Sequence, residues 1–223
     1  MTSRELLRTG AETIGIDLSI EYIDSFFVYF AELEKWNKKI NLTNIREEQD
    51  IVIKHGLDSL SYIKGFTPTR GLRLLDIGSG AGFPALPIKI IHPEIAVTLV
   101  ESVKKKASFL RHIVRTLKLN SVEVIDTRTD QLSDSFHTAF DVVTARAFAG
   151  MASVLSAGSP FLKQDGLLVL SRGPEETICE HELARFRFAL ENQIGLTLPH
   201  SNYKRTIWVF RKLRDVPRGT FNY

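Results

Sequence analysis

The 223-residue sequence has few of the features that define secreted or membrane proteins. Its single cysteine, Cys179, excludes an internal disulfide network and fits a reducing compartment. No uncharged apolar run approaches the roughly 20 residues of a membrane-spanning helix. Acidic residues interrupt the N-terminal region, where a secretory signal needs an unbroken apolar stretch. We therefore expect a soluble, cytoplasmic protein that does not bind membranes.

The charge balance is only mildly basic. Lys and Arg total 29 against 26 acidic residues, which gives a net charge of +3. Such an excess permits a nucleic-acid partner without requiring one. At 43% apolar residues the chain can bury one full core and carry an accessory unit. We see no internal repeat and no low-complexity tract.

The N-terminal part lacks strand signals and is predicted to be helical. Apolar residues recur at helical spacing over 19–36, with Ser19 as the N-cap, and a shorter helix is expected at 47–54. The stretch 64–71, KGFTPTRG, is rich in helix breakers and marks a junction. We therefore divide the chain into an N-terminal helical extension, 1–70, and a Rossmann-like domain, 71–223.

Beyond the junction, short apolar runs alternate with helical stretches. This alternation predicts an α/β fold with a mostly parallel sheet that is covered on both faces. The expected strands are 72–78, 95–101, 122–126, 140–145 and 166–171. One helix is expected to begin near residue 84, and three more are expected at 102–119, 151–162 and 175–193. An antiparallel strand pair is expected within 196–213.

A glycine loop follows the first predicted strand, in LLDIGSGAGFPALPI. Gly78, Gly80 and Gly82 would let a ligand approach the backbone at a helix N-terminus. The dinucleotide fingerprint requires a further glycine where Phe83 stands, which disfavours a hydride-transferring oxidoreductase. With Asp76 before it, the spacing looks like the first motif of class I S-adenosylmethionine-dependent methyltransferases. Asp76 can serve the cofactor's ammonium group, and the glycine N–H groups its carboxylate.

Two further positions favour an adenosine ligand. Glu101 ends the second predicted strand, 23 residues after Gly78, where an acid accepts hydrogen bonds from both ribose hydroxyls. Thr129 and Asp130 follow the third strand, where such folds commonly contact the adenine amino group.

The chain lacks the usual residues for several methyl acceptors. No Asn/Asp-Pro-Pro-aromatic loop, typical of exocyclic amine methylation, follows the fourth strand, which reads TARAFAG instead. Cys179, predicted to lie inside a helix among acidic residues, is interpreted as a packing residue and not a nucleophile. No acid–base pair stands out. This suits an acceptor with a free lone pair, such as guanine N7.

Arginines are placed where a ligand would bind. Arg128, Arg146 and Arg172 follow the third, fourth and fifth strands, so we expect them to converge at the carboxyl edge of the sheet. We assign them, with Arg205, to phosphate or carboxylate binding, and surface ion pairing is the alternative for each. A stripe of four cations in the helix at 102–119 is more simply a solvated face; it comprises Lys104, Arg111, Arg115 and Lys118.

His55 and Asp58, in KHGLDSL, are too few ligands for a metal site. A helix terminus with a capping side chain is the preferred interpretation. A role at the mouth of the pocket stays open. We expect no metal cofactor.

Five motifs in order, WNKKINLTNI with HGLDSL, LLDIGSGAGFPALPI, TARAFA and KRTIWVF, resemble the RsmG/GidB family of small-subunit ribosomal RNA methyltransferases over about 26–211. The resemblance implies a class I methyltransferase fold and methylation of guanine N7 at position 527, in the 530 loop of 16S rRNA. The cofactor positions that it implies are Gly78, Phe83, Glu101, Ser102, Val103, Thr129, Asp130 and Arg146. Its other arginines match Arg128 and Arg205.

Two residues depart from the family pattern. Ala85 replaces a usual glycine, and Arg172 stands where lysine is expected, which keeps the charge but changes its geometry. A methyltransferase acting on another RNA, a protein or a small molecule remains an alternative, as does an RNA-binding module without catalysis. Nothing in the sequence suggests an obligate dimer, so a monomer is expected.

Overall fold

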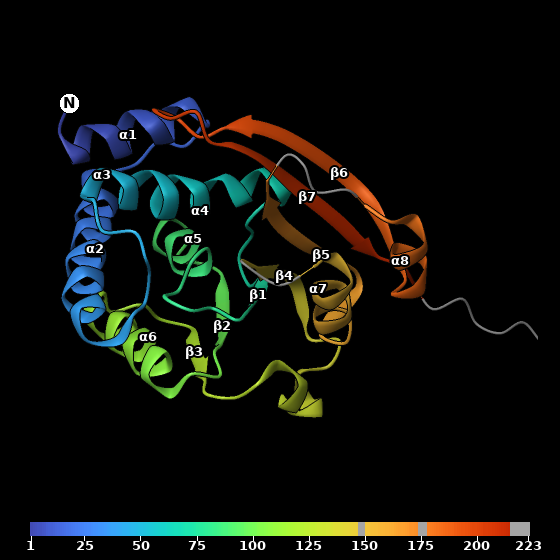
Figure 1. Ribbon diagram of the computed structural model, residues 1–223. Helices are drawn as coiled ribbons and strands as arrows, with labels where there is room; N and C mark the ends of the chain where they lie inside the picture. Colours follow the sequence, from blue (N-terminus) through green and yellow to red (C-terminus); the bar gives the residue numbers. More distant parts are fainter. Residues whose placement is uncertain (147–149, 174–177, 215–223) are drawn as a thin grey trace, which may run out of the picture.

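A seven-stranded sheet runs through the centre of the protein (Figure 1). The structure, a computed structural model, describes residues 1–146, 150–173 and 178–214. Five strands are parallel in the order β3-β2-β1-β4-β5; β7 then pairs antiparallel with β5, and β6 pairs antiparallel with β7. The strands are β1 (Arg73–Ile77), β2 (Ala96–Val100), β3 (Val122–Ile125), β4 (Phe140–Ala145), β5 (Leu162–Arg172), β6 (Phe188–Thr197) and β7 (Lys204–Lys212). The predicted mostly parallel sheet with a C-terminal antiparallel pair is confirmed.

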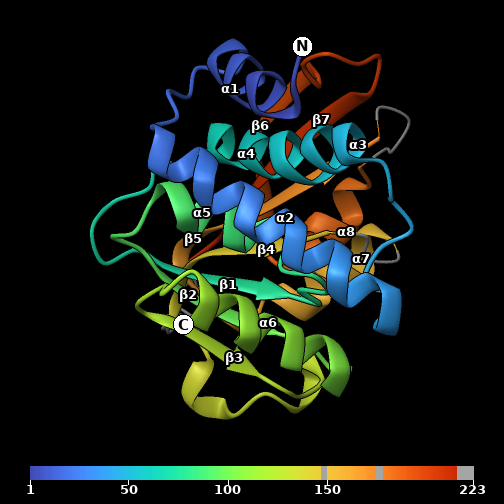
Figure 2. The ribbon, with the colours of Figure 1, turned by 90° about the vertical axis from the view of Figure 1, so that its left-hand side faces the viewer.

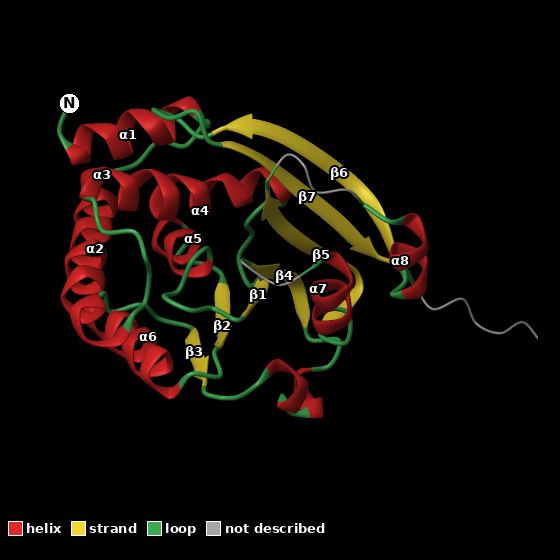
Figure 3. Cartoon of the chain, viewed as in Figure 1, coloured by secondary structure: helices red, strands yellow, loops and turns green. Residues whose placement is uncertain are grey.

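Both faces of the sheet are buried by helices (Figure 3). Leu74 and Val142 pack on the face covered by α5 (Ala85–Ile91) and α6 (Lys104–Thr116). Their neighbours Leu75 and Val143 belong to a second core, formed with α7 (Met151–Gly158) and α8 (Glu180–Arg185). Successive side chains of a strand point to opposite faces, so a strand buried on both sides must be apolar at consecutive positions.

The N-terminal helices share the first of these cores. In α2 (Ile20–Ile40) the Ser19 hydroxyl accepts the Tyr22 N–H, which confirms the predicted start of this helix. Phe26, Tyr29 and Leu33 on α2 are buried in the cluster that also holds Leu74 of the sheet. Figure 2 shows α2 lying across α5 and α6. A further helix, α1 (Ser3–Thr13), was not predicted; it begins with a capping box between Thr2 and Glu5. The boundary at residue 70 stays a prediction.

The short helix predicted at 47–54 is part of a longer helical stretch. It consists of α3 (Glu48–Ile51), a π-helical segment η1 (Val52–Leu57), α4 (Asp58–Ser61) and a 3₁₀ segment η2 (Tyr62–Gly65). Gly56, a helix breaker by propensity, is used here for packing, because an added Cβ would lie 3.2 Å from the ring of Phe30. His55 and Asp58 therefore lie inside a helix, and their interpretation as helix-terminal residues is wrong.

The helix predicted at 175–193 is the largest error. Its first residues lie outside the described ranges; α8 ends at Arg185, and β6 begins at Phe188. Arg187, with φ of 59°, reverses the chain between them. Edge pairing with β7 along 188–197 overrides the local helical pattern. Cys179 stands at the N-cap of α8 and is exposed, so its interpretation as a packing residue is also wrong.

Other helices are shorter than predicted. The helix expected at 151–162 ends at Gly158, since Pro160 cannot continue it, and β5 begins at Leu162. Val103, inside the helix predicted at 102–119, precedes α6 as the N-cap and is 45% exposed. The cationic stripe around α6 is exposed throughout, as predicted for a solvated face. Short 3₁₀ segments η3 (Thr129–Gln131) and η4 (Asp134–Phe136) follow β3.

Helix length and composition bear on the membrane question. The longest helix, α2, has 21 residues and carries charged side chains along its length. Within the described ranges, no helix combines the length and the apolar character that a membrane crossing requires.

Candidate active site

The glycine loop connects β1 to α5 at the carboxyl edge of the sheet. Gly78, Gly80 and Gly82 have φ of 69°, 58° and 94°, the left-handed region that side chains disfavour. The N–H groups of Gly78 and Ser79 both donate to the carbonyl of Val100, at 2.9 and 3.0 Å. The loop is therefore fixed over the end of β2.

Two of these glycines face different surroundings. A Cβ on Gly82 would lie 2.5 Å from Leu86 and 2.7 Å from the Tyr29 hydroxyl, so this glycine is packed into the protein. A Cβ on Gly80 would meet only the Gly78 carbonyl, at 3.9 Å. Gly80 faces open space, which is where a ligand can approach the backbone.

Glu101 is buried directly after β2. Its Oε2 accepts the Gly80 N–H at 2.8 Å, and its Oε1 accepts the Val103 N–H at 2.7 Å. Each carboxylate oxygen can accept a second hydrogen bond. The backbone bonds thus orient the carboxylate and leave it able to accept two ribose hydroxyls, the role predicted for this acid.

Asp76, in β1, is 1% exposed. The Thr144 hydroxyl donates to its Oδ1 at 2.7 Å. Its Oδ2 is buried and has no hydrogen-bond partner among the described residues. Burial raises the pKa of this carboxyl to about 7, against the opposing effect of the Thr144 hydrogen bond. A buried, half-satisfied carboxyl beside the glycine loop fits a ligand that carries a positive charge, such as the ammonium of S-adenosylmethionine.

A cavity of about 340 Å³ opens beside the glycine loop at the ends of β2 and β3. It is lined by Gly78, Val100, Ser102, Thr127, Arg128, Thr129, Asp130 and Ala157. The structure thus brings together four predicted cofactor positions, from the loop, β2 and η3. The remaining predicted positions are not in its lining. Of these, Val103 is exposed as the N-cap of α6, and the Phe83 side chain is buried against Tyr29 and His55.

Arg146 lies at the end of β4, between the glycine loop and η1. Its Nη2 is 3.0 Å from His55 Nδ1, its Nη1 donates to the Lys54 carbonyl at 3.3 Å, and its guanidinium lies 5.1 Å from the Phe83 ring centroid. These contacts fix the cation on an aromatic face. Residues 147–149 of the TARAFAG motif lie outside the described residues.

His55 orients Arg146 and was missed as a site residue. Because a guanidinium can only donate, Nδ1 must accept, and the neutral ring donates from Nε2 to the Thr43 hydroxyl at 2.8 Å. Burial and the nearby Arg146 charge lower the pKa of His55 to about 3, so the ring stays neutral. It stacks on Phe83 with centroids 4.4 Å apart. The HGLDSL motif was the signal in the sequence, because a role for it at the mouth of the pocket is one of the two interpretations given above.

A second ion pair lies beside this group. Arg205 Nε, on β7, donates to Asp58 Oδ1 at 3.1 Å, and the Ser171 hydroxyl donates to the same oxygen at 3.3 Å. Burial raises the pKa of Asp58, while the Arg205 charge opposes the rise. Arg172 ends β5, opposite Thr206 of β7. In the described part of the chain no cluster of three or more metal-ligating side chains is present.

The three strand-end arginines do not form one cluster. Arg146 and Arg172 end adjacent strands, β4 and β5. Arg128 follows β3, which lies three strand positions from β4 in the sheet. At the usual strand spacing β3 and β4 are therefore about 14 Å apart. Its guanidinium makes a two-point ion pair with Asp130 at 3.0 and 3.1 Å. The expected convergence is therefore wrong for Arg128.

Comparison with known sequences identifies close relatives. The model of the GidB family, described as rRNA small subunit methyltransferase G, matches residues 23–208. The ribosomal RNA small subunit methyltransferase G of Caldanaerobacter subterraneus subsp. tengcongensis is 38% identical over 220 residues, covering 96% of this chain and 92% of that protein. The protein of the same name from Roseiflexus castenholzii is 46% identical over 190 residues, covering 83% of this chain and 78% of the other.

Solved structures share the fold. M. jannaschii TYW2, crystallised in complex with AdoMet, superposes with a TM-score of 0.55 at 15% identity, covering 71% of this chain and 77% of that one. At such low identity the likeness concerns the fold alone. The fold is that of class I S-adenosylmethionine-dependent methyltransferases.

Proposed function

This chain belongs to the GidB family, rRNA small subunit methyltransferase G, and we propose that it methylates N7 of guanine 527, in the 530 loop of 16S rRNA. The protein is an S-adenosylmethionine-dependent methyltransferase, and its substrate is RNA of the small ribosomal subunit. The position and the ring nitrogen are the finer part of the proposal. They rest on the resemblance to this family and on the chemistry of the site.

The observation that carries the proposal is the buried carboxyl of Asp76 beside the open face of Gly80. We assign the cofactor's ammonium to Asp76. Its carboxylate is assigned to Arg146 and not, as the sequence predicted, to the glycine N–H groups, because those of Gly78, Gly80 and Gly82 already donate within the protein. Glu101 would hold the ribose hydroxyls. Thr129 and Asp130, which line the neighbouring cavity, would contact the adenine.

The absence of a free general base among the described residues at this edge supports a ring-nitrogen acceptor. Both nitrogens of His55 are engaged, and Asp76 is buried and assigned to the cofactor's ammonium. S-Adenosylmethionine supplies an electrophilic methyl group, whose bond to sulfur breaks as the bond to N7 forms. Guanine N7 carries a lone pair and no proton, so no proton has to be removed. The residues of the site contribute by positioning the two reactants.

Arg146 is assigned to orienting the substrate. The methylated guanine gains a positive charge, which a cation at the ring would oppose. Held by His55 and the Lys54 carbonyl, Arg146 is suited to contact a phosphate or the cofactor's carboxylate instead. Arg205 and Arg172, on adjacent strands, are candidates for further phosphate contacts.

The experiment is methyl transfer with labelled donor to small subunits that lack the modification. Label recovered as 7-methylguanine at position 527 supports the proposal. Label in another nucleotide or another RNA would overturn the assigned position. Cofactor binding without transfer to any RNA would favour the non-catalytic RNA-binding alternative. Small subunits already methylated at the site are the matched control, and they should accept no label.

We further place the enzyme in the cytoplasm, where small subunits are assembled, and describe it as a monomer whose residues 1–70 extend a methyltransferase domain at 71–223.

A further inference from the structure

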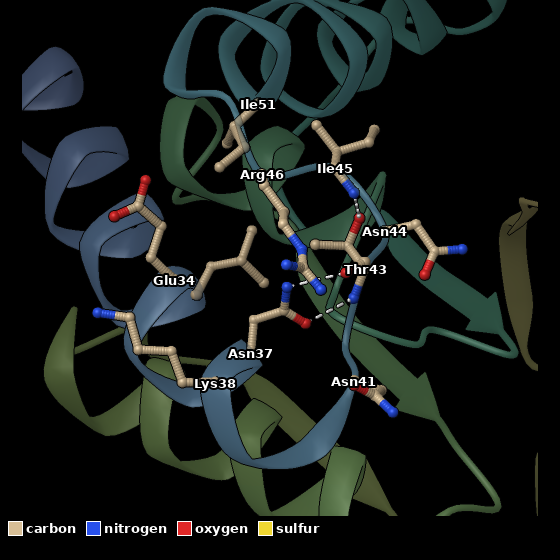
Figure 4. Close-up of a pocket in the computed structure, with 10 residues that line it drawn as sticks. Glu34, Asn37, Lys38, Asn41, Thr43, Asn44, Ile45, Arg46 and Ile51 are labelled. Atoms are coloured by element: carbon tan, nitrogen blue, oxygen red, sulfur yellow. Dashed lines mark hydrogen bonds between the residues drawn. The ribbon is translucent and has the colours of Figure 1, made fainter.

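A second cavity, of about 490 Å³, lies outside the cofactor region (Figure 4). It is formed by the last turns of α2 and the segment that follows to α3. Its lining residues are Leu33, Glu34, Asn37, Lys38, Asn41, Thr43, Asn44, Ile45, Arg46 and Ile51. Its volume lies within the range of ligand pockets, roughly 300–1,000 Å³.

The wall of this cavity is held in a fixed conformation. Asn37 Oδ1 accepts the N–H groups of Leu42 and Thr43 at 2.6 and 3.0 Å, and its Nδ2 donates to the Thr43 carbonyl at 2.8 Å. The Thr43 hydroxyl accepts the Ile45 N–H at 3.1 Å. Asn37 of α2 thus fixes the backbone at Leu42 and Thr43, and Thr43 fixes it at Ile45, so this part of the cavity wall is preformed.

The lining combines cations, amides and an apolar floor. Lys38 and Arg46 are exposed, and neither has an ion-pair partner in the parts of the chain that the structure describes. The side chains of Asn41 and Asn44 likewise make no hydrogen bond to a described residue. Leu33 and Ile51 are buried beneath the cavity, and half-buried Ile45 is the apolar residue that a ligand can contact. This set matches a nucleotide: cations for a phosphate, amides for base edges and an apolar surface for a base face. The one acid, Glu34, can accept from an exocyclic amine.

The position of the cavity relates it to the active site. The segment 41–47 and the end of α2 lie on the side of the molecule toward which β1 points, which is the edge that carries the glycine loop (Figure 2). Thr43, in the cavity wall, is hydrogen-bonded to His55, and His55 is hydrogen-bonded to Arg146. A strand of RNA lying across this edge can reach both places.

We propose that this cavity binds a nucleotide of the substrate RNA next to the methylated guanine, with Lys38 and Arg46 contacting its phosphates. The inference rests on the proposed function, because it requires that RNA is the substrate. It assigns the N-terminal helices a direct share in substrate binding.

The test removes both cations in K38A/R46A and measures binding to unmethylated small subunits as a function of salt. Two lost contacts to single-stranded phosphate should reduce the slope of log affinity against log salt by about 1.4. Binding should weaken by about 25-fold at 0.1 M salt, and the difference should vanish toward 1 M. In methyl transfer, KM for the subunit should rise while kcat is retained.

The matched control is K64A/R70A. Lys64 and Arg70 are also exposed and without an ion-pair partner in the described ranges, and neither lines the cavity; Arg70 lies shortly before β1, at the opposite edge of the sheet. This variant loses the same charge, and its binding should change little. Affinity for S-adenosylmethionine should equal that of the wild type in both variants.

The outcomes separate the two proposals. If the wild type methylates the subunit and K38A/R46A binds it with unchanged affinity and salt slope, the cavity is not an RNA site. The same conclusion follows if the control loses as much affinity as the test variant. If the wild type transfers no methyl group to small-subunit RNA, the proposed function fails, and this inference fails with it.

Discussion

Replacing Asp76 with Asn should make the unliganded protein more stable at neutral pH and impair its function. Asn has the shape of a protonated Asp and can still accept the Thr144 hydroxyl at Oδ1. It removes the negative charge that burial opposes. In the free protein this charge has no ammonium to neutralise it, so its removal should stabilise the fold.

The size of this stability difference follows from the pKa of Asp76. The carboxyl has a model value of 3.8 and is raised by burial to about 7 in the folded protein. A group whose pKa is raised on folding binds its proton more tightly in the folded state, so wild-type stability falls as pH rises through this window. A shift of this size corresponds to about 4 kcal/mol at pH 8. At pH 4 the same relation predicts that the charge of Asp76 costs the wild type less than about 1 kcal/mol of stability.

Urea unfolding of both proteins at pH 8 and pH 4 measures this difference. Asp76→Asn should be the more stable protein at pH 8, and the two should nearly coincide at pH 4. Other titrating groups are common to both and cancel. Asp17→Asn, at an exposed position, is the control and should show no such pH-dependent gap.

Cofactor binding should change in the opposite direction. The variant should lose affinity for S-adenosylmethionine, measured by calorimetry, because the ammonium loses its carboxylate. Near pH 7 the wild type should also release a proton on binding, since a bound cation lowers the pKa of Asp76. A variant that is less stable than the wild type at pH 8, or that binds the cofactor as well, would refute this account of Asp76.

Substitutions at Gly80, Gly82 and His55 test the neighbouring groups. Gly80→Val should abolish cofactor binding in calorimetry. It should lower the free energy of unfolding by only about 1–3 kcal/mol, the cost of a side chain at the φ of 58°. Gly82→Ala should lower the free energy of unfolding more, because its Cβ would clash with Leu86 and Tyr29. Undiminished donor affinity in Gly80→Val would contradict the role given to the loop. His55→Asn keeps an acceptor at the position of Nδ1, whereas His55→Gln keeps the contact to Thr43 instead. The Asn variant should therefore retain about tenfold more kcat/KM than the Gln variant, which corresponds to about 1.4 kcal/mol in transition-state stabilisation. Equal activities at equal unfolding free energies would show that His55 does not position Arg146.

The parallel strands and the cofactor loop could be predicted because their signals are local. Consecutive apolar residues such as Leu74 and Leu75, followed by closely spaced glycines, specify a doubly covered strand and its turn without reference to distant parts of the chain. The same holds for Glu101, whose offset from the loop follows from the length of one βαβ unit.

The errors lie where distant contacts decide. Residues 188–193 form a strand because β7 offers an edge, and Gly56 continues a helix because the Phe30 ring fills the space of a side chain. The bond from His55 to Arg146 joins residues 91 positions apart. No local pattern encodes these pairings, so the site residues contributed by the N-terminal helices could not be derived from spacing.

Phe83 explains why those helices belong to the active site. In dinucleotide-binding folds a glycine at this position lets the helix pack closely on the strand. Here a buried phenyl ring occupies the place, stacked between Tyr29 of α2 at 5.0 Å and His55 of η1 at 4.4 Å. Tyr29 also donates to the Ala81 carbonyl, and Arg146 lies over the same phenyl ring. The residue that argued against a dinucleotide is therefore the contact through which the N-terminal helices fix both the glycine loop and the arginine, so the extension and the cofactor site form one structural unit.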